Sequence, residues 1–402
     1  MDMKTSIKLE GARLARASSA SALCALAIIS CLHSPQARAD ATADRATATL
    51  LYQRLTGVPP TDAILGQMQP LIASNPAAAA AIATAQPQFY NVTLKNIFLP
   101  ATNRDQSVFV PLNDYVVTAI GMIHDDVPFN TALSADILYT LSAGGLPAPS
   151  LANNNHYATA DANNVDISAS LVKTTQTAVY GSGIAPAGLI TTRASTSAFF
   201  INGTNRAMFR FTLINHLCRD MEQVQDTSRP TDQIRQDVST SPGGDSRVYL
   251  NTCISCHAGM DPMARAFAYY NFDTTALTTV YTPGKVQAKY FINSSNDKFG
   301  FVTPDDTWSN RWRAGPNSLI GFDPTLPGTG NGAASLGQEL AASDGFADCQ
   351  VQKAFKAVCL RAPSSQADLN AVATIKGNFK ANGYKLKQVF ADTAVYCTVT
   401  AP

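Results

Sequence analysis

Three residues near the middle of the chain, Cys253, Cys256 and His257, have the types and the spacing needed to hold a metal-containing group. Two thiols spaced C-x-x-C and followed directly by histidine are typical of covalent haem c attachment, in which each thiol adds to a vinyl group. The adjacent imidazole then serves as the proximal ligand of the iron. The motif therefore predicts one covalent haem c, attached through Cys253 and Cys256 and bound at its iron by His257.

A zinc site or a redox-active disulfide could also use a C-x-x-C pair. Structural zinc takes four Cys or His ligands, which come in paired clusters, but the chain has no second C-x-x-C. A redox disulfide of the thioredoxin kind is expected in a βαβ context, which the surrounding residues do not suggest. The chain also lacks G-x-S-x-G, phosphate-loop and H-E-x-x-H motifs. These absences favour haem as the cofactor.

The first 39 residues have the pattern of a secretory signal peptide. Basic residues precede a short apolar segment over 21–32, and an Ala-Arg-Ala cleavage pattern ends at Ala39. No later segment approaches the roughly 18 apolar residues needed to cross a membrane. We therefore expect export to the periplasm and no transmembrane segment in the mature chain. Lipid anchoring through Cys31 is an alternative, because the residues before it loosely resemble a lipoprotein box.

The charge of the chain argues against polyanionic partners. Removal of the signal peptide would take away five basic and two acidic residues, which changes the formal net charge from +1 to −2 over 363 residues. A near-neutral surface gives no reason to expect binding to nucleic acid or to an anionic membrane. The expected partner is a redox protein, which the sequence does not identify.

The hydrophobic spacing predicts a mainly α fold with irregular loops and a few short strands. Helices are expected within residues 41–98, from Asn113, over 206–222, around the motif cysteines, from Asp261-Pro262 to 270, over 335–361 and over 366–397. The predicted divisions are a signal peptide over 1–39, an N-terminal helical domain over 40–150, a loop-rich linker over 151–187, a haem c domain over 188–335 and a C-terminal helical domain over 336–402.

From about Gly188 onward, a set of short motifs follows one another in a distinctive order. They are Leu217-Cys218, Cys253 to His257, Met260-Asp261-Pro262, Asn271-Phe272-Asp273, Phe346 to Cys349, Arg361 and Phe379 to Phe390. This order resembles the planctomycete-type cytochrome c modules, in which a haem-bearing domain of unknown function precedes a small helical companion domain. The resemblance implies a helical cytochrome c-like haem domain behind a helical N-terminal domain, and it implies no substrate. This chain departs from the pattern by carrying a single haem motif and by lacking the usual proline run after Cys218.

Four further cysteines, Cys218, Cys349, Cys359 and Cys397, predict two disulfides in an oxidising compartment. The residues alone leave three pairings open. The resemblance implies the pair Cys218–Cys349, which leaves Cys359–Cys397. Cys349 and Cys359 would lie about 15 Å apart along one helix, beyond the ~7 Å limit between bridged α-carbons.

The second axial ligand of the iron is less well defined. His156 is the candidate distal ligand, because it lies in an Asn-rich loop and because the pair His156-Tyr157 resembles the family's His-Tyr segment. Five-coordinate iron is also open. Other residues weighed as ligands, propionate partners or pocket walls have plain structural alternatives; these are His124, His216, Met208, Met221, Met260, Met263, Arg206, Arg210, Arg219, Trp308 and Trp312.

Three functions are compatible with a haem c protein of this length. The favoured one is an exported single-haem cytochrome that transfers electrons. The main alternative is a haem c peroxidase or oxygenase-like enzyme with an open distal iron position. The third is a surface-associated binding protein whose haem is chiefly structural.

Overall fold

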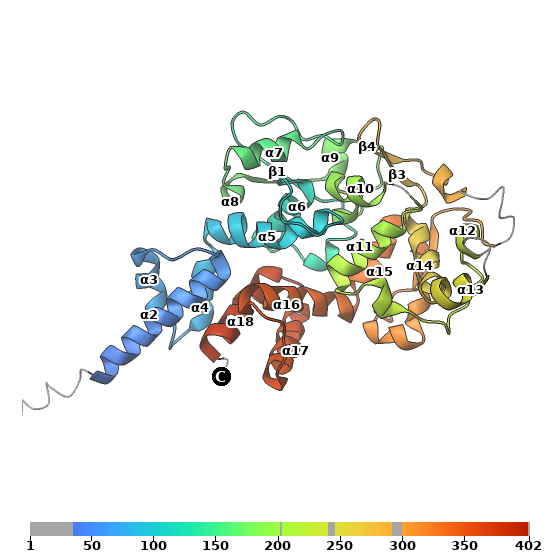
Figure 1. Ribbon diagram of the computed structural model, residues 1–402. Helices are drawn as coiled ribbons and strands as arrows, with labels where there is room; N and C mark the ends of the chain where they lie inside the picture. Colours follow the sequence, from blue (N-terminus) through green and yellow to red (C-terminus); the bar gives the residue numbers. More distant parts are fainter. Residues whose placement is uncertain (1–34, 202, 240–245, 292–299, 401–402) are drawn as a thin grey trace, which may run out of the picture.

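The computed structural model describes residues 35–201, 203–239, 246–291 and 300–400. Most of the predicted signal peptide, including Cys31, lies outside the described residues. Within them the chain is mainly helical, with three pairs of short antiparallel strands (Figure 1). The α-helices are α2 (Pro35–Thr56), α3 (Asp62–Met68), α4 (Pro76–Thr84), α5 (Lys95–Phe98), α6 (Asp114–His124), α7 (Asn155–Ala162), α8 (Ile167–Ser170), α9 (Gln176–Tyr180), α10 (Arg193–Phe199), α11 (Arg206–Leu217), α12 (Gln236–Ser239), α13 (Ser246–Val248), α14 (Ile254–Ala264), α15 (Gly332–Ala341), α16 (Asp344–Cys359), α17 (Gln366–Ala381) and α18 (Leu386–Val395). The strands are β1 (Leu138–Leu141) with β2 (Leu171–Thr174), β3 (Tyr270–Asp273) with β4 (Thr278–Tyr281), and β5 (Thr307–Ser309) with β6 (Thr329–Asn331). None of the described helices combines the length and the apolar character needed to cross a membrane.

The first and last helices of the chain share one hydrophobic core. A continuous cluster of buried side chains runs from Ala48 in α2 to Ala394 in α18. In Figure 1, α2 and α4 lie beside α18, and α16 extends from there toward α11. The C-terminal helices therefore support α11, whose first residue reaches the site described below.

Two disulfides fix the C-terminal helices. Cys218, at the end of α11, is bonded to Cys349 of α16. Cys359 closes α16 and is bonded to Cys397 in the last turn of the chain. The first bond joins the pair that the family resemblance implies, and the second joins the pair that this leaves.

The helix expected over 206–222 is shorter than the hydrophobic pattern predicts. Cys218 has a left-handed backbone (φ 53°), which ends α11 at Leu217. Asp220 then caps a separate short helix, η6 (Met221–Val224), by accepting a hydrogen bond from the amide of Met221. The hydrophobic spacing continues across Cys218, so the pattern does not indicate that the helix ends there.

Two other expected helices are each divided in two. Ser343 caps the start of α16 with its side chain, so α15 and α16 replace one helix over 335–361. The positive φ angles of Gly383 and Tyr384 form the turn between α17 and α18. The segment 151–187, in which the sequence predicts one short helix near residues 167–172, is also more regular than expected. It contains three short helices and β2, which pairs with β1 on the other side of the predicted boundary at 150.

Candidate functional site

Cys253, Cys256 and His257 line a single cavity of about 580 Å³. Its walls come from α11, η6 and the segment in which the short helix η8 (Tyr249–Cys253) runs into α14. The structure thus brings the whole motif to one cavity. The other lining residues are Arg104, Arg206, Ala207, Arg210, Phe211, Met221, Thr252 and Met260.

The helix α14 positions these residues. Side chains three and four positions apart share one face of a helix, which directs Cys253, Cys256 and His257 to the same side. The expectation that Asp261-Pro262 begins a new helix is wrong, because α14 runs unbroken from Ile254 to Ala264. Every residue from Ala258 to Ala264 is buried. Tertiary packing here outweighs the helix-breaking tendency of proline, which lacks an N–H for the carbonyl of Ala258.

The two motif thiols are free. Neither Cys253 nor Cys256 belongs to a disulfide, and both are half-buried. Burial raises the pKa of the Cys256 thiol, which keeps it protonated at neutral pH. Its S–H donates to the carbonyl oxygen of Met221 at 3.7 Å. Both sulfurs lie at the cavity wall, where they can meet a group placed there.

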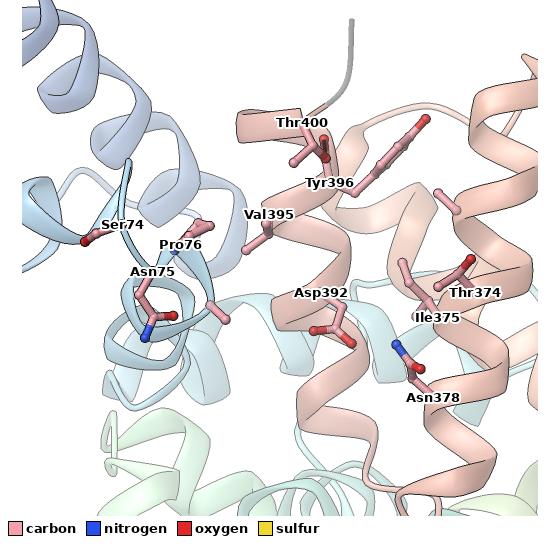
Figure 2. A pocket seen from close by; sticks show the side chains of 12 residues that line it. Ser74, Asn75, Pro76, Thr374, Ile375, Asn378, Asp392, Val395, Tyr396 and Thr400 are labelled. Atoms are coloured by element: carbon pink, nitrogen blue, oxygen red, sulfur yellow. Dashed lines mark hydrogen bonds between the residues drawn. The ribbon is translucent and has the colours of Figure 1, made fainter.

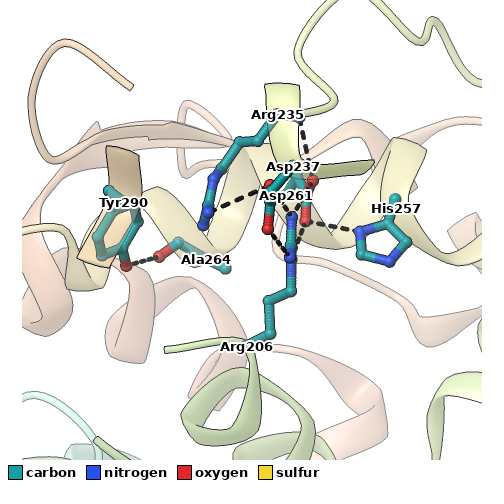
Figure 3. Close-up of polar contacts among 7 residues, drawn as sticks. All are labelled: Arg206, Arg235, Asp237, His257, Asp261, Ala264 and Tyr290. Carbon is teal, nitrogen blue, oxygen red and sulfur yellow. Dashed lines mark hydrogen bonds and ion pairs between the residues drawn. The ribbon is translucent and has the colours of Figure 1, made fainter. Parts of the chain in front are cut away.

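The ring of His257 is oriented by a carboxylate. Its Nδ1 lies 3.0 Å from Oδ1 of Asp261, one helical turn further along α14 (Figure 3). The carboxyl group of Asp261 is fully buried. An ionised carboxylate can only accept a hydrogen bond, so Nδ1 of His257 carries the proton. Because Nδ1 faces Asp261, Nε2 is the ring nitrogen available to a metal.

The guanidinium of Arg206 also binds the carboxylate of Asp261. Its Nε and Nη2 atoms donate to the two Asp261 oxygens at 2.8 and 2.9 Å. Its Nη1 and Nη2 atoms also donate to Asp237 at 2.7 and 3.1 Å. Arg235 adds a second cation, 3.2 Å from Asp237, and its backbone amide donates to Asp261 (Figure 3). Two arginines thus face two aspartates in a charge-balanced network, of which Asp261 and Arg235 are buried and Arg206 and Asp237 partly exposed.

This network keeps Asp261 ionised. Burial alone would raise the pKa of Asp261, because it disfavours the charged form. The guanidinium of Arg206 and the ring of His257 outweigh that effect and hold the pKa well below its usual range. Asp261 is therefore a permanent acceptor for the His257 ring proton at physiological pH.

The structure does not bring His156 to this cavity, and its expected role as distal ligand is not supported by its surroundings. His156 lies buried in α7, where its Nδ1 contacts the carbonyl of Pro147 at 2.7 Å. Its Nε2 accepts a hydrogen bond from the amide of Leu141 in β1 at 3.1 Å. Both ring nitrogens are occupied, so His156 ties the 142–155 loop to β1. The Asn-rich loop that suggested a ligand is the connection that His156 stabilises.

The other two described histidines also lie elsewhere. His216 is buried beside Tyr115, whose hydroxyl is 3.0 Å from Nε2. His124 contacts the carboxylate of its neighbour Asp125 at 2.7 Å. Neither lines the cavity of the motif.

The two tryptophans serve packing. Trp308 donates to the hydroxyl of Ser335 at 2.8 Å. Trp312 is fully buried and does not line the cavity; it packs against Gly259 of α14 and Phe209 of α11. Trp312 therefore fixes the position of the motif helix from behind.

The arginines considered for propionates differ in their positions. Arg206 is fully engaged by Asp261 and Asp237, and Arg210 forms an exposed bidentate pair with Asp220. Arg219 does not line the cavity. Arg206 is thus a structural cation of the site rather than a free anion-binding group.

Two residues of the site, Arg104 and Asp261, have no role in the expectations drawn from the sequence. Arg104 reaches the cavity from a loop more than a hundred residues earlier and donates to the carbonyls of Ala198 and Ile201. No local pattern marks such a contact. Asp261, four residues after His257, follows from helical spacing alone. Met221, a possible ligand with helix core as its plain alternative, lies at the cavity wall.

A second cavity, of about 440 Å³, lies between the start of α4 and the helices α17 and α18 (Figure 2). Asn75 and Pro76 border one side, and Asp392 of α18 faces Asn378 of α17. Burial raises the pKa of Asp392. This cavity contains neither a cysteine nor a histidine among its lining residues, so it does not compete with the motif site for the same chemistry.

Comparison of the chain with models of protein families, with curated proteins and with solved structures gives no match. The site is therefore judged on its donor set. Among the described residues, no group of three or more histidine, cysteine and acidic side chains is arranged to hold a metal ion. Haem brings its own four nitrogens to iron and needs only axial ligands from the protein. Two free thiols, one imidazole with an available Nε2 and a cavity with apolar walls fit that requirement.

Proposed function

We propose that this chain is an exported c-type cytochrome that carries a single haem on Cys253, Cys256 and His257 and transfers electrons. The observation that supports this best is the convergence of two unpaired thiols and one oriented imidazole on a single cavity. The proposal includes a cytochrome c-like arrangement of the helices around the cavity, membership of the planctomycete-type module family, and a periplasmic location.

Each residue of the motif has a defined task in this proposal. Cys253 and Cys256 would each add S–H across a vinyl group, with sulfur bonding to one carbon and hydrogen to the other. His257 would bind the iron through Nε2 while Asp261 holds its Nδ1 proton. When bound, the haem would supply one-electron chemistry at its iron. Phe211, Ala207 and Met260 would exclude water from its apolar faces.

Met221 replaces His156 as the candidate for the second axial position. It is the methionine of the cavity wall that comes from outside α14, whereas Met260 lies on the same helix as His257. A thioether on one face and imidazole on the other is a known axial pair of electron-transfer haem. An iron that lacks this ligand would instead be open to peroxide or oxygen, which is the enzyme alternative.

Covalent haem is tested by production of the full chain in a periplasm that contains the c-haem maturation machinery. We expect a haem band that stays with the polypeptide after denaturation. The variant Cys253→Ala/Cys256→Ala should lose this band, and His257→Ala should retain little haem. His124→Ala is the matched histidine control and should keep a wild-type amount. Wild-type protein without covalent haem under these conditions would refute the proposal.

Carrier and enzyme are separated by the spectrum of the purified protein. Low-spin iron that does not react with carbon monoxide, cyanide or peroxide is expected for a carrier. High-spin iron that binds these molecules and turns over peroxide would contradict electron transfer as the main function and favour the enzyme.

A further inference from the structure

We propose that Asp261 is a positioning residue that increases electron donation from His257 and thereby lowers the reduction potential of the site. The inference rests on the proposed function, because it requires iron bound to Nε2 of His257. It goes beyond that function by assigning the control of the potential to one side chain outside the C-x-x-C-H motif.

The first support is the geometry of the pair. Both residues belong to α14 at a spacing of four, and Nδ1 and Oδ1 are 3.0 Å apart. One rigid helix therefore holds donor and acceptor together. The carboxyl group of Asp261 is 0% exposed, so water does not compete for the ring proton. A buried carboxylate that accepts this proton makes the imidazole more basic and a stronger donor to a metal.

The second support is the arrangement of charge around Asp261. Arg206 meets both of its oxygens, and the backbone amide of Arg235 adds a third donor. These contacts leave the carboxylate no freedom to turn away from His257. Arg206 is also shared with Asp237, which is itself 3.2 Å from Arg235. The positive charge of Arg206 is therefore divided between two carboxylates and does not fully neutralise Asp261.

Stronger electron donation from His257 should lower the reduction potential of the iron. A stronger donor favours the ferric over the ferrous state, because the oxidised iron has the greater need of electron density. Hydrogen bonding to the axial ligand is one of the means by which a protein tunes the potential of haem. The pair should therefore place the potential below that of the same site with an uncharged acceptor at position 261.

The chain offers a matched control in Asp237. It is a second acidic residue bound to Arg206, but it has no contact with His257 in the described part of the chain. Asp261→Asn and Asp237→Asn each remove one negative charge from the same network. Only Asp261→Asn weakens the hydrogen bond from the axial ligand.

The test is a redox titration of the full-length, haem-loaded protein and of both variants. We expect Asp261→Asn to shift the ferrous-to-ferric ratio at a fixed potential by at least tenfold, which is a rise of about 59 mV for a one-electron couple. Asp237→Asn should shift it clearly less. An unchanged potential in Asp261→Asn would overturn the inference. Equal shifts in the two variants would also overturn it, because charge alone would then explain them.

A measurement on wild-type protein avoids the risk that Asp261→Asn fails to fold. In the haem-loaded protein labelled with ¹⁵N-histidine, the Nδ1 proton of His257 should exchange slowly with D₂O because Asp261 holds it. Rapid exchange would contradict the inference. Failure of wild-type protein to bind haem would instead contradict the proposed function, so the two failures are distinguishable.

Discussion

Gly259 of α14 lies against the indole ring of Trp312 so closely that a β-carbon at position 259 would be 1.9 Å from Nε1. Trp312 is fully buried and packs on Phe209 of α11, with ring centroids 5.7 Å apart. The ring cannot move aside without displacing α11. The absence of a side chain at 259 therefore determines how near the motif helix approaches the rest of the core.

Gly259→Ala should destabilise the protein, although alanine favours a helix over glycine by about 1 kcal/mol. Overpacking a closely packed core costs roughly 1–3 kcal/mol, and the contact with Trp312 leaves no room. Gly377→Ala is the control, because a β-carbon at that position of α17 meets nothing within 4 Å. Urea denaturation should show a loss of stability for the first and a gain of up to about 1 kcal/mol for the second. Equal gains would show that α14 and Trp312 are further apart.

Arg206→Met should lower the free energy of unfolding far more than Arg210→Met. The first change leaves Asp261 and Asp237 without their shared cation, and breaking a buried ion pair costs roughly 3–5 kcal/mol. Arg210 and Asp220 form an exposed pair, for which roughly 0–1 kcal/mol is expected. The two arginines lie one turn apart on α11, and the same substitution is made at both. Chemical denaturation of the haem-free variants measures the difference, and similar losses would contradict a buried network.

His216 should make stability sensitive to mild acid. Burial, with a smaller contribution from Lys353, holds its pKa well below 6.5 in the folded state. Below pH 6.5 the unfolded chain therefore binds a proton that the folded chain does not. The protein is therefore not destabilised by this residue above pH 6.5. Its stability falls as the pH drops from 6.5 toward the pKa of His216 in the folded state. The direction of the effect is therefore a loss of stability on acidification below pH 6.5.

The measurement compares wild type with His216→Gln at about pH 7.5 and about pH 5. The variant should lose clearly less stability than wild type over this range. His124→Gln is the control and should follow wild type, since His124 is partly exposed on the surface. A parallel loss in His216→Gln would show that other groups cause the acid sensitivity.

Removal of either disulfide should lower the free energy of unfolding, and the disulfide that closes the longer loop should cause the larger loss. The cysteines of Cys218–Cys349 are 131 residues apart and those of Cys359–Cys397 are 38 apart. The chain-entropy relation gives losses of about 5 and about 4 kcal/mol respectively. Double alanine variants of each pair, compared by thermal denaturation, avoid stray thiols. Wild-type stability in either double variant would indicate that the bond does not form.

If Met221 is the second axial ligand, Met221→Leu should change the spin state of the iron. The haem-loaded variant should convert from low-spin to high-spin and bind carbon monoxide. Met260→Leu is the control at the same cavity and should keep the low-spin spectrum. Identical spectra for wild type and Met221→Leu would exclude Met221 from the iron.

The sequence predicts the local part of the site well and its distant part poorly. Cys253, Cys256 and His257 are within one helical turn, so their spacing alone places them on one face. Asp261 follows from the same periodicity. Arg104, Arg206 and Met221 reach the cavity from other segments, and nothing in their neighbours indicates it.

The same distinction applies to the fold. Helical periodicity predicts a mainly α protein, because each amphipathic face is a local property. It does not predict where helices end when a left-handed residue such as Cys218 or Tyr384 interrupts a continuing pattern. His156 was expected to have a functional role because of its Asn-rich loop and the family resemblance. Its hydrogen bonds to Pro147 and Leu141 depend on how that loop folds, which no local pattern indicates.

The order of the cysteines along the chain has a consequence for biosynthesis. Cys218 must find Cys349, and both Cys253 and Cys256 are synthesised before that partner exists. In an oxidising compartment, Cys253 and Cys256 are available to Cys218 before Cys349 is, and neither is its partner in the folded structure. Correct folding therefore requires that the motif thiols stay reduced until Cys349 arrives, or that an early bond be exchanged. Pairing of the cysteines is therefore a step of biosynthesis that the order of the chain alone does not guide.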